Sequence, residues 1–360
     1  SSGISRANTA IAKIPEIKMN ESKKNRLIAE ARTLRALYYF NLVRFFGDVP
    51  LILDLKTVED SKGPRDSKEL IYDQIIEDLT FAEEHLPLRS EYSASDEGRI
   101  NKGAAKILFG KVYLTKGDFQ KAKDKLAEVV EHESEYGFGL HKDYHANWLR
   151  DTEAGIEAVL YIEYKEPPFQ HNGEMALAGP KYSIPGSLGI SALNEADIPT
   201  QELYDQFDNR DLRKKTNFKT EFAHLKTGEI LKSSIPLSGK FWVEGLETGD
   251  RCDVNMHIIR YADAILMYAE ALNEVGKSTK ALAMLNRIRE RAFGDDSGNF
   301  KPMSKDEFRT AILNERRLEF PHEGHRWFDL VRTGTFIQRM KEHSACLLYT
   351  SPSPRDLSTS

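Results

Sequence analysis

The spacing of apolar residues predicts long amphipathic helices toward both ends of the chain. Between Glu21 and Phe46 these residues recur every three or four positions, which places them on one face of a helix. They are Leu27, Ala31, Leu34, Tyr38, Leu42 and Phe45. Gly47 can take the left-handed conformation that ends a helix, and Pro50 disfavours helical backbone just before it. We therefore predict that this helix ends at Phe46.

Helix hairpins are predicted to recur along the chain. The same spacing predicts further helices at 67–84, 101–116, 119–131, 261–275, 279–292 and 305–320. Two pairs of these helices match at one constant offset. The matched positions are Ala105 and Ala264, Gly117 and Gly276, Ala122 and Ala281, and Leu126 and Leu285. A glycine in the turn and a small alanine where the helices approach are typical of tetratricopeptide-like hairpins.

The middle of the chain, residues 133–254, does not follow this pattern. It is rich in Gly, Pro, Asn and aromatic residues, and it predicts only a short strand at 157–164 and a short helix at 200–209. Loops of this length are uncommon in compact proteins unless they carry a function. We therefore expect ligand binding in this insertion.

Composition excludes some classes of function. The 360 residues include 51 Lys and Arg against 56 Asp and Glu, a formal net charge of −5, which argues against nucleic-acid binding. No apolar run approaches the roughly 18 residues of a membrane span. Cys252 and Cys346 are too few for a disulfide framework or a four-thiolate zinc site.

Several ordered motifs resemble those of the SusD/RagB family, outer-membrane nutrient-binding lipoproteins of Bacteroidota. The first is AEARTLRALYYF at 29–40, followed by FGDVPL at 46–51. The others are GAAK to VYL at 103–114, RYAD to MYAEALN at 260–273, NRIRERA at 286–292, and ERRLEF to GHRWFDL at 315–330. The resemblance covers about residues 4–333.

This resemblance implies a mainly α, SusD-like fold: a tetratricopeptide-like hairpin scaffold with a long, loop-rich insertion containing short strands. We expect one domain over 1–343, with hairpins at about 4–132 and 255–333 and the ligand-binding insertion at 133–254. Residues 344–360 have no counterpart in the family, and we expect a non-native or disordered tail there.

The resemblance also implies a non-enzymatic protein exposed on the cell outer membrane. It would capture oligosaccharides or other nutrients for a SusC-like TonB-dependent transporter barrel and would need no cofactor. Family members attach to the membrane through a lipidated N-terminal Cys, which is not found in this chain. We expect no nucleic-acid partner.

Aromatic residues of the insertion are the candidate ligand-binding residues. Sugar rings present apolar C–H faces and hydroxyl edges, so they bind aromatic side chains flanked by polar groups. The candidates are Trp148, Tyr164, Phe169, Tyr182 and Trp242, with Tyr144 nearby. Hydrogen bonds could come from Asn147, Arg150, His171, Asn172 and Lys181. The alternative is that these aromatic residues pack the insertion onto the helices.

A second hypothesis is a helical-repeat scaffold that binds only peptides or proteins. Such a scaffold would leave Trp148, Tyr182 and Trp242 dispersed or buried, whereas a nutrient-binding protein would gather some of them on one exposed face. The chain shows no nucleophile elbow and no dinucleotide fingerprint, so nothing in it favours catalysis.

Charged residues of the motifs have structural interpretations. Arg32 and Arg35 lie on a helix rich in apolar residues, so we expect at least one to be partly buried and paired with a carboxylate. Glu30, Asp48 and Asp78 are the nearest candidates; recognition of an anionic ligand is the functional alternative. The spacing of His322, Glu323 and His325 does not suit a zinc site. The charged residues of the ERRLEF and GHRWFDL motifs are expected to form ion pairs that hold the last helix and its exit turn in place. They are Glu315, Arg316, Arg317, Glu319, Arg326 and Asp329.

Overall fold

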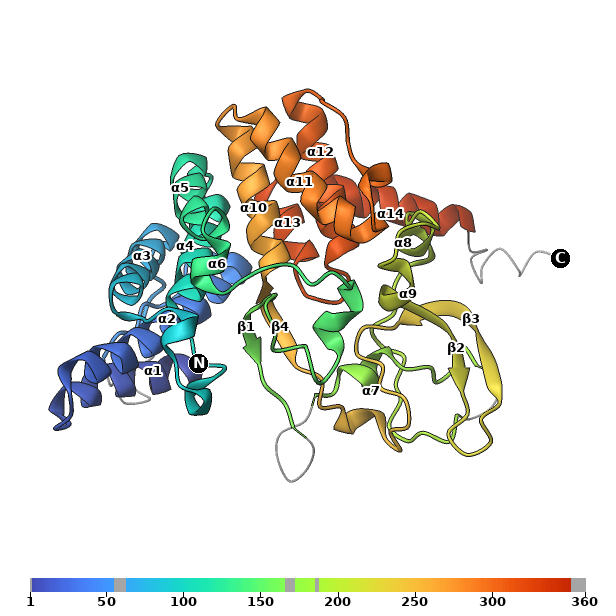
Figure 1. Cartoon of the computed structure of the whole chain (residues 1–360), viewed down its shortest axis with the longest axis horizontal. Helices are drawn as coiled ribbons and strands as arrows, with labels where there is room; N and C mark the ends of the chain where they lie inside the picture. The colour runs from blue at the N-terminus through green and yellow to red at the C-terminus, as the bar shows by residue number, and fades with distance from the viewer. Residues whose placement is uncertain (1, 55–62, 166–171, 185–187, 351–360) are drawn as a thin grey trace.

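Helices dominate the computed structural model, which describes residues 2–54, 63–165, 172–184 and 188–350. The N-terminal group contains α1 (Ser2–Lys13), α2 (Glu21–Phe46), α3 (Lys68–His85), α4 (Lys102–Lys116), α5 (Phe119–Val130) and α6 (Glu133–Tyr136). The C-terminal group contains α10 (Tyr261–Glu274), α11 (Ser278–Phe293), α12 (Lys305–Glu319), α13 (Arg326–Arg332) and α14 (Phe336–Thr350). The two groups stand side by side, and the insertion lies below the C-terminal group and beside the N-terminal group in Figure 1. The predicted mainly α fold is confirmed.

Capping residues explain where the predicted helices begin. Asn20, Ser67 and Asn101 each precede a helix, and each side chain accepts a hydrogen bond from a backbone N–H of the first turn. The predicted range 21–46 coincides with α2, whereas α3 and α4 begin one residue after the predicted starts because Ser67 and Asn101 are caps.

The predicted repeat is present as two hairpins, α4–α5 and α10–α11. Gly117 and Gly276 occupy the equivalent turns with φ of 79° and 77°, a backbone conformation that favours glycine. Ala122 and Ala281 are completely buried where the paired helices approach. The hairpins therefore follow from a small set of glycine and alanine positions.

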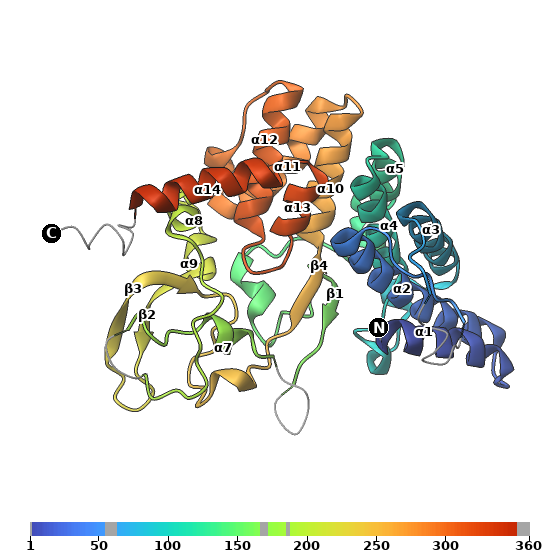
Figure 2. The same cartoon turned by 180° about the vertical axis from the view of Figure 1, so that it is seen from behind.

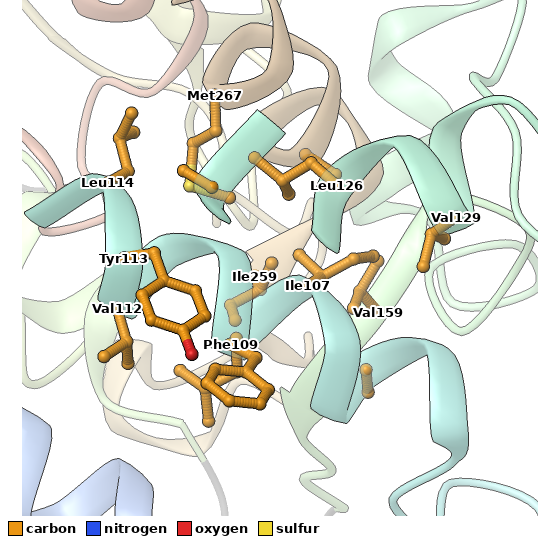
Figure 3. Packing of buried hydrophobic residues seen from close by; sticks show 14 of the residues in the cluster. Ile107, Phe109, Val112, Tyr113, Leu114, Leu126, Val129, Val159, Ile259 and Met267 are labelled. Atoms are coloured by element: carbon orange, nitrogen blue, oxygen red, sulfur yellow. The ribbon is translucent and has the colours of Figure 1, made fainter. Parts of the chain in front are cut away.

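The core of the scaffold is one continuous apolar cluster that extends through both helix groups. Figure 3 shows part of it, where Leu126 of α5 and Met267 of α10 pack with α4 residues, together with Val159 and Ile259 from two strands. Because all these side chains are buried, the hairpins and the first strands of the insertion share one hydrophobic core.

The insertion contributes strands β1, β2 and β3 to two small antiparallel sheets, and it also contains short helices. Strand β1 (Ala158–Ile162) pairs with β4 (Met256–Arg260), and β2 (Phe218–Ala223) pairs with β3 (Ile230–Ser238). Its short helices are α7 (Glu174–Ala178), α8 (Gln201–Asp205) and α9 (Lys214–Asn217). The predicted strand at 157–164 and helix at 200–209 correspond to β1 and α8; the other strands were not predicted.

A buried ion-pair network joins the insertion to the C-terminal helices. It consists of Glu157, Arg213, Lys240, Arg260, Arg291, Glu315, Glu319 and Glu323. Glu319 is central: its carboxylate lies 2.9 Å from Arg213 Nη1 and 3.0 Å from Arg260 Nη1, and it also pairs with Arg291. Burial alone would raise the pKa of Glu319, but these three arginines lower it to about 2. The ionised carboxylate therefore links the two regions.

The charged motif residues also pair as expected. Arg35 is buried and contacts Asp78 at 2.7 Å, one of the predicted partners. Arg316 contacts Asp329 at 2.8 Å and Asp263 at 2.7 Å, which ties α12 to α13 and α10. These arginines therefore have structural roles.

Helix α14 crosses the face of the C-terminal group that is turned toward the viewer in Figure 2. It continues from Phe336 to Thr350, across the predicted domain boundary at residue 343. Within the described residues, the helices lack the combined length and apolar character that a transmembrane span requires.

Candidate functional site

Tyr182 is the candidate aromatic residue that the structure leaves open to solvent. Its side chain is 76% exposed on the loop that follows α7. The ammonium group of Lys181 lies 5.2 Å from the centre of its ring. A flat, exposed ring beside a hydrogen-bond donor can stack against a sugar and bind its hydroxyl groups.

The backbone around Tyr182 is held by one carboxylate. The N–H groups of Lys181, Tyr182 and Ser183 all donate hydrogen bonds to Oε2 of Glu195. Partial burial would raise the pKa of Glu195, but these N–H donors lower it, so the carboxylate is ionised at neutral pH. Glu195 itself has a φ of 55°, an uncommon conformation for a residue other than glycine. The exposed ring therefore stands on a fixed loop.

Trp148 and Tyr144 lie together but are buried. Trp148 is only 4% exposed, and its ring meets that of Tyr144 edge to face at 4.8 Å. Lys240 lies 4.6 Å and Arg260 5.3 Å from the centre of the Trp148 ring. These contacts are cation–π interactions with members of the buried ion-pair network, so they give Trp148 a packing role.

The remaining candidates are spread through the insertion. Trp242 is half-buried between two small apolar clusters and contacts Phe222 edge to face at 4.7 Å. Tyr164 is half-buried, and its backbone N–H donates to Asn255 at 2.9 Å. Phe169 lies outside the described residues, as does His171. The described candidates therefore do not share one exposed face.

Most of the proposed hydrogen-bonding residues are engaged within the protein. Buried Asn147 donates to the carbonyl of Tyr144, and buried Asn172 donates to that of Val254. Arg150 pairs with Asp253 at 2.7 Å. Among the proposed donors that the structure describes, Lys181 lies exposed beside a candidate ring.

A cavity of about 550 Å³, not predicted from the sequence, lies between the end of α2, strand β4 and the turn at 322–325. Trp148 and Phe241 of the insertion and Phe40 and Phe328 of the helices contribute aromatic walls. Phe40 lies in the AEARTLRALYYF motif and Phe328 in the GHRWFDL motif, but their proximity depends on the fold.

Metal binding finds no support in the placement of the histidines. Within the described ranges, no three His, Cys, Asp or Glu side chains are grouped to hold a metal ion. His322 contacts Asp197 at 3.0 Å, and Glu323 pairs with Lys240 and Arg260.

Comparisons with known proteins agree on one family. Residues 240–350 match the model of the SusD family, and residues 2–114 match a model described as starch-binding and associating with the outer membrane. A SusD-like protein of Formosa agariphila is 31% identical over 91% of this chain and 69% of its own length. A SusD-like protein of Bacteroides ovatus is 26% identical over 87% of this chain and 60% of its own length.

Solved structures give the same result. A laminarin-binding SusD-like protein is 29% identical with a TM-score of 0.78, over 95% of this chain and 78% of that one. Surface glycan-binding protein A from Bacteroides uniformis is 25% identical with a TM-score of 0.77, over 92% of this chain and 72% of that one.

Proposed function

Because the chain belongs to the SusD family of glycan-binding, outer-membrane-associated proteins, we propose that it captures oligosaccharides at the cell surface without cleaving them. The captured glycan would pass to a SusC-like TonB-dependent transporter barrel. The observation that carries this proposal is the family match, which includes relatives named for binding laminarin and surface glycans.

Tyr182 is the residue we propose as the exposed binding platform. Its ring is accessible, its backbone is held by Glu195, and Lys181 adds a charged donor beside it. Trp148, Tyr164 and Trp242 would act indirectly, because they pack the insertion that positions this loop. Stacking contributes roughly 0.5 to 1.5 kcal/mol beyond burial, so loss of the Tyr182 ring should weaken binding about twofold to tenfold.

The test is affinity electrophoresis of the purified chain against a panel of soluble polysaccharides. We expect at least one neutral or acidic glycan to retard migration, and Tyr182→Ala to reduce that retardation without lowering the melting temperature. Ile337→Ala is the control, because Ile337 is 63% exposed on α14 and belongs to a different element from the loop that carries Tyr182. Equal retardation of Tyr182→Ala and the parent chain would exclude this ring from the site.

A peptide-binding or protein-binding scaffold is the alternative function. The burial of Trp148 and the partial burial of Trp242 favour it, because aromatic residues that pack the insertion are not available to a glycan. Failure of every polysaccharide to bind would support this alternative.

A further inference from the structure

The cavity between the scaffold and the insertion has the size and lining of a small-molecule site. Its volume of about 550 Å³ lies within the range of ligand pockets, roughly 300 to 1,000 Å³. Aromatic rings line it, among them Phe40, Phe45, Trp148 and Phe328. Phe45 is 55% exposed, so it borders the opening of the cavity to solvent. Such walls suit the apolar C–H faces of a sugar ring.

Arg44 supplies a cation to this cavity. Its guanidinium carbon lies 3.6 Å from the centre of the Phe328 ring and 4.0 Å from that of Phe40. Arg44 Nε donates to the carbonyl of Phe40, and Nη2 donates to the side-chain oxygen of Asn41. Burial lowers the pKa of Arg44 to about 10, so it stays charged at neutral pH.

The surroundings of Arg44, which is partly buried, differ from those of the fully buried arginines. Arg35, Arg260 and Arg316 each form an ion pair with a carboxylate. Across the described part of the chain, no carboxylate forms an ion pair with Arg44. The carboxylates of Asp263 and Asp329 act on Arg44 electrostatically but do not pair with it directly, so the guanidinium can still bind an anionic ligand, and it suits a carboxylate in particular.

Two neighbouring residues add N–H donors. His325 Nδ1 lies 3.3 Å from the ammonium of Lys111, so Nδ1 accepts and Nε2 carries the proton. Burial and the Lys111 charge keep this ring neutral by lowering its pKa to about 3. Nε2 of His325 and Nε1 of Trp148 are both buried, and neither has a hydrogen-bond partner within the residues that the structure describes. Both residues line the cavity.

Acceptors are present on the opposite, insertion side. Glu174 lines the cavity, and burial raises the pKa of its carboxyl group. His257 Nε2 lies 2.9 Å from the carbonyl of Asn147, so Nε2 donates there and Nδ1 remains an acceptor. At the rim, His322 has a φ of 60° and contacts Asp197 at 3.0 Å. Strained residues of this kind cluster at ligand sites.

We propose that this cavity binds one carboxylated sugar ring, such as the uronic acid residue of an acidic glycan. The accessible rings of Phe45 and Phe328 would contact the sugar ring, Arg44 would bind the carboxylate, and Glu174 would accept a hydrogen bond from a hydroxyl group. This inference rests on the proposed glycan-binding function and names a class of ligand for a site separate from Tyr182.

Isothermal titration with glucuronate, galacturonate and their short oligomers tests the inference, with glucose and galactose oligomers of equal length as neutral counterparts. We expect the uronates to bind at least about tenfold more tightly than the neutral sugars, and the difference to shrink at high salt. Equal affinity for both classes, or no detectable binding of uronates, would overturn it.

Substitutions of cavity residues test whether uronates bind in this cavity. Arg44→Gln should weaken uronate binding roughly tenfold to a hundredfold, because a charged hydrogen-bond donor is lost. Arg210→Gln is the matched control, since Arg210 is exposed and pairs with Asp208 in the insertion. If Arg44→Gln does not fold, Phe45→Ala tests the same site at its exposed rim and should also weaken binding. Unchanged uronate affinity in a folded variant would contradict the proposal.

The two proposals can fail separately. Binding of a neutral polysaccharide that depends on Tyr182, without uronate binding, would contradict the cavity site and leave glycan capture supported. Absence of binding to every neutral and acidic glycan would contradict both.

Discussion

The helix hairpins and the insertion are stabilised by different interactions. The hairpins share one large apolar cluster that continues from α2 to α12. The insertion has two small apolar clusters of its own and is joined to the C-terminal helices by the buried ion-pair network. Apolar packing is tolerant of small changes, whereas a buried charge that loses its partner is costly.

Apolar packing therefore holds the hairpins together, while ion pairs hold most of the insertion against them. The charged residues of the buried ion-pair network then position the loops of the insertion on the C-terminal helices. Substitutions in the network, the hairpin core, the turns and the binding surface should therefore have separable effects.

The largest expected effect is loss of the central carboxylate of the network. Glu319→Ala would leave Arg213, Arg260 and Arg291 without a shared partner, and should lower the free energy of unfolding by roughly 3 to 5 kcal/mol. Urea denaturation measures this change. Glu342→Ala, which breaks an exposed pair with Arg339, is the control and should leave the stability nearly unchanged. Similar losses for both variants would refute the role of the network.

A smaller loss is expected from the hairpin core. Leu126→Ala should cost about 3 kcal/mol, because Leu126 is fully buried and fills the space beside Gly110 in α4. Leu285→Ala tests the equivalent position of the second hairpin and should cost a similar amount. Leu70→Ala, at a residue that is 47% exposed on α3, should be nearly neutral. A neutral Leu285→Ala would mean that the two hairpins are not equivalent.

Acid should weaken the link between the insertion and the scaffold. The folded pKa of Glu319 is depressed to about 2 from an ordinary value of 4.5. Its contribution to stability is therefore present above about pH 4.5 and is lost as the pH falls toward 2. The urea midpoint, measured from pH 7 to pH 2.5, should fall across this window. Glu319→Gln should flatten the dependence; an equally steep fall in this variant would assign it to other groups.

The smallest expected effect on stability is at a hairpin turn. Gly117→Ala should cost about 1 kcal/mol, because the φ of 79° strains any residue with a Cβ, even though no atom lies within 4 Å of the added group. Gly173→Ala is the control, since Gly173 has a φ of −93° and also has open space for a Cβ. Thermal melting distinguishes the two, and equal melting temperatures would show that the turn conformation carries no strain.

The scaffold could be predicted from the sequence because its signals are local. Apolar spacing, the caps Asn20, Ser67 and Asn101, and the turn glycines all act within a few residues of the helices they define. The antiparallel strands β2 and β3 were not predicted. Pro236 interrupts the apolar pattern of β3, and a short sheet depends on partners distant in sequence.

The candidate site was less predictable, because exposure depends on the whole fold. Location in a loop suggested both Trp148 and Tyr182, yet Trp148 is buried against Lys240 and Tyr182 is open to solvent. The partners Glu157 and Arg260 are 103 residues apart, and no local pattern indicates which arginine a given carboxylate will meet. The sequence also gives no indication that Arg44, unlike Arg35, forms no ion pair within the described residues.

Glycan capture without cleavage is the central claim, and one experiment measures both parts of it. The purified chain is titrated with the polysaccharide that most retards its migration, and the same sample is assayed for reducing ends over several hours. The account predicts saturable binding, weakened by Tyr182→Ala, with no increase in reducing ends. A steady release of reducing ends that depends on the concentration of the chain would contradict it.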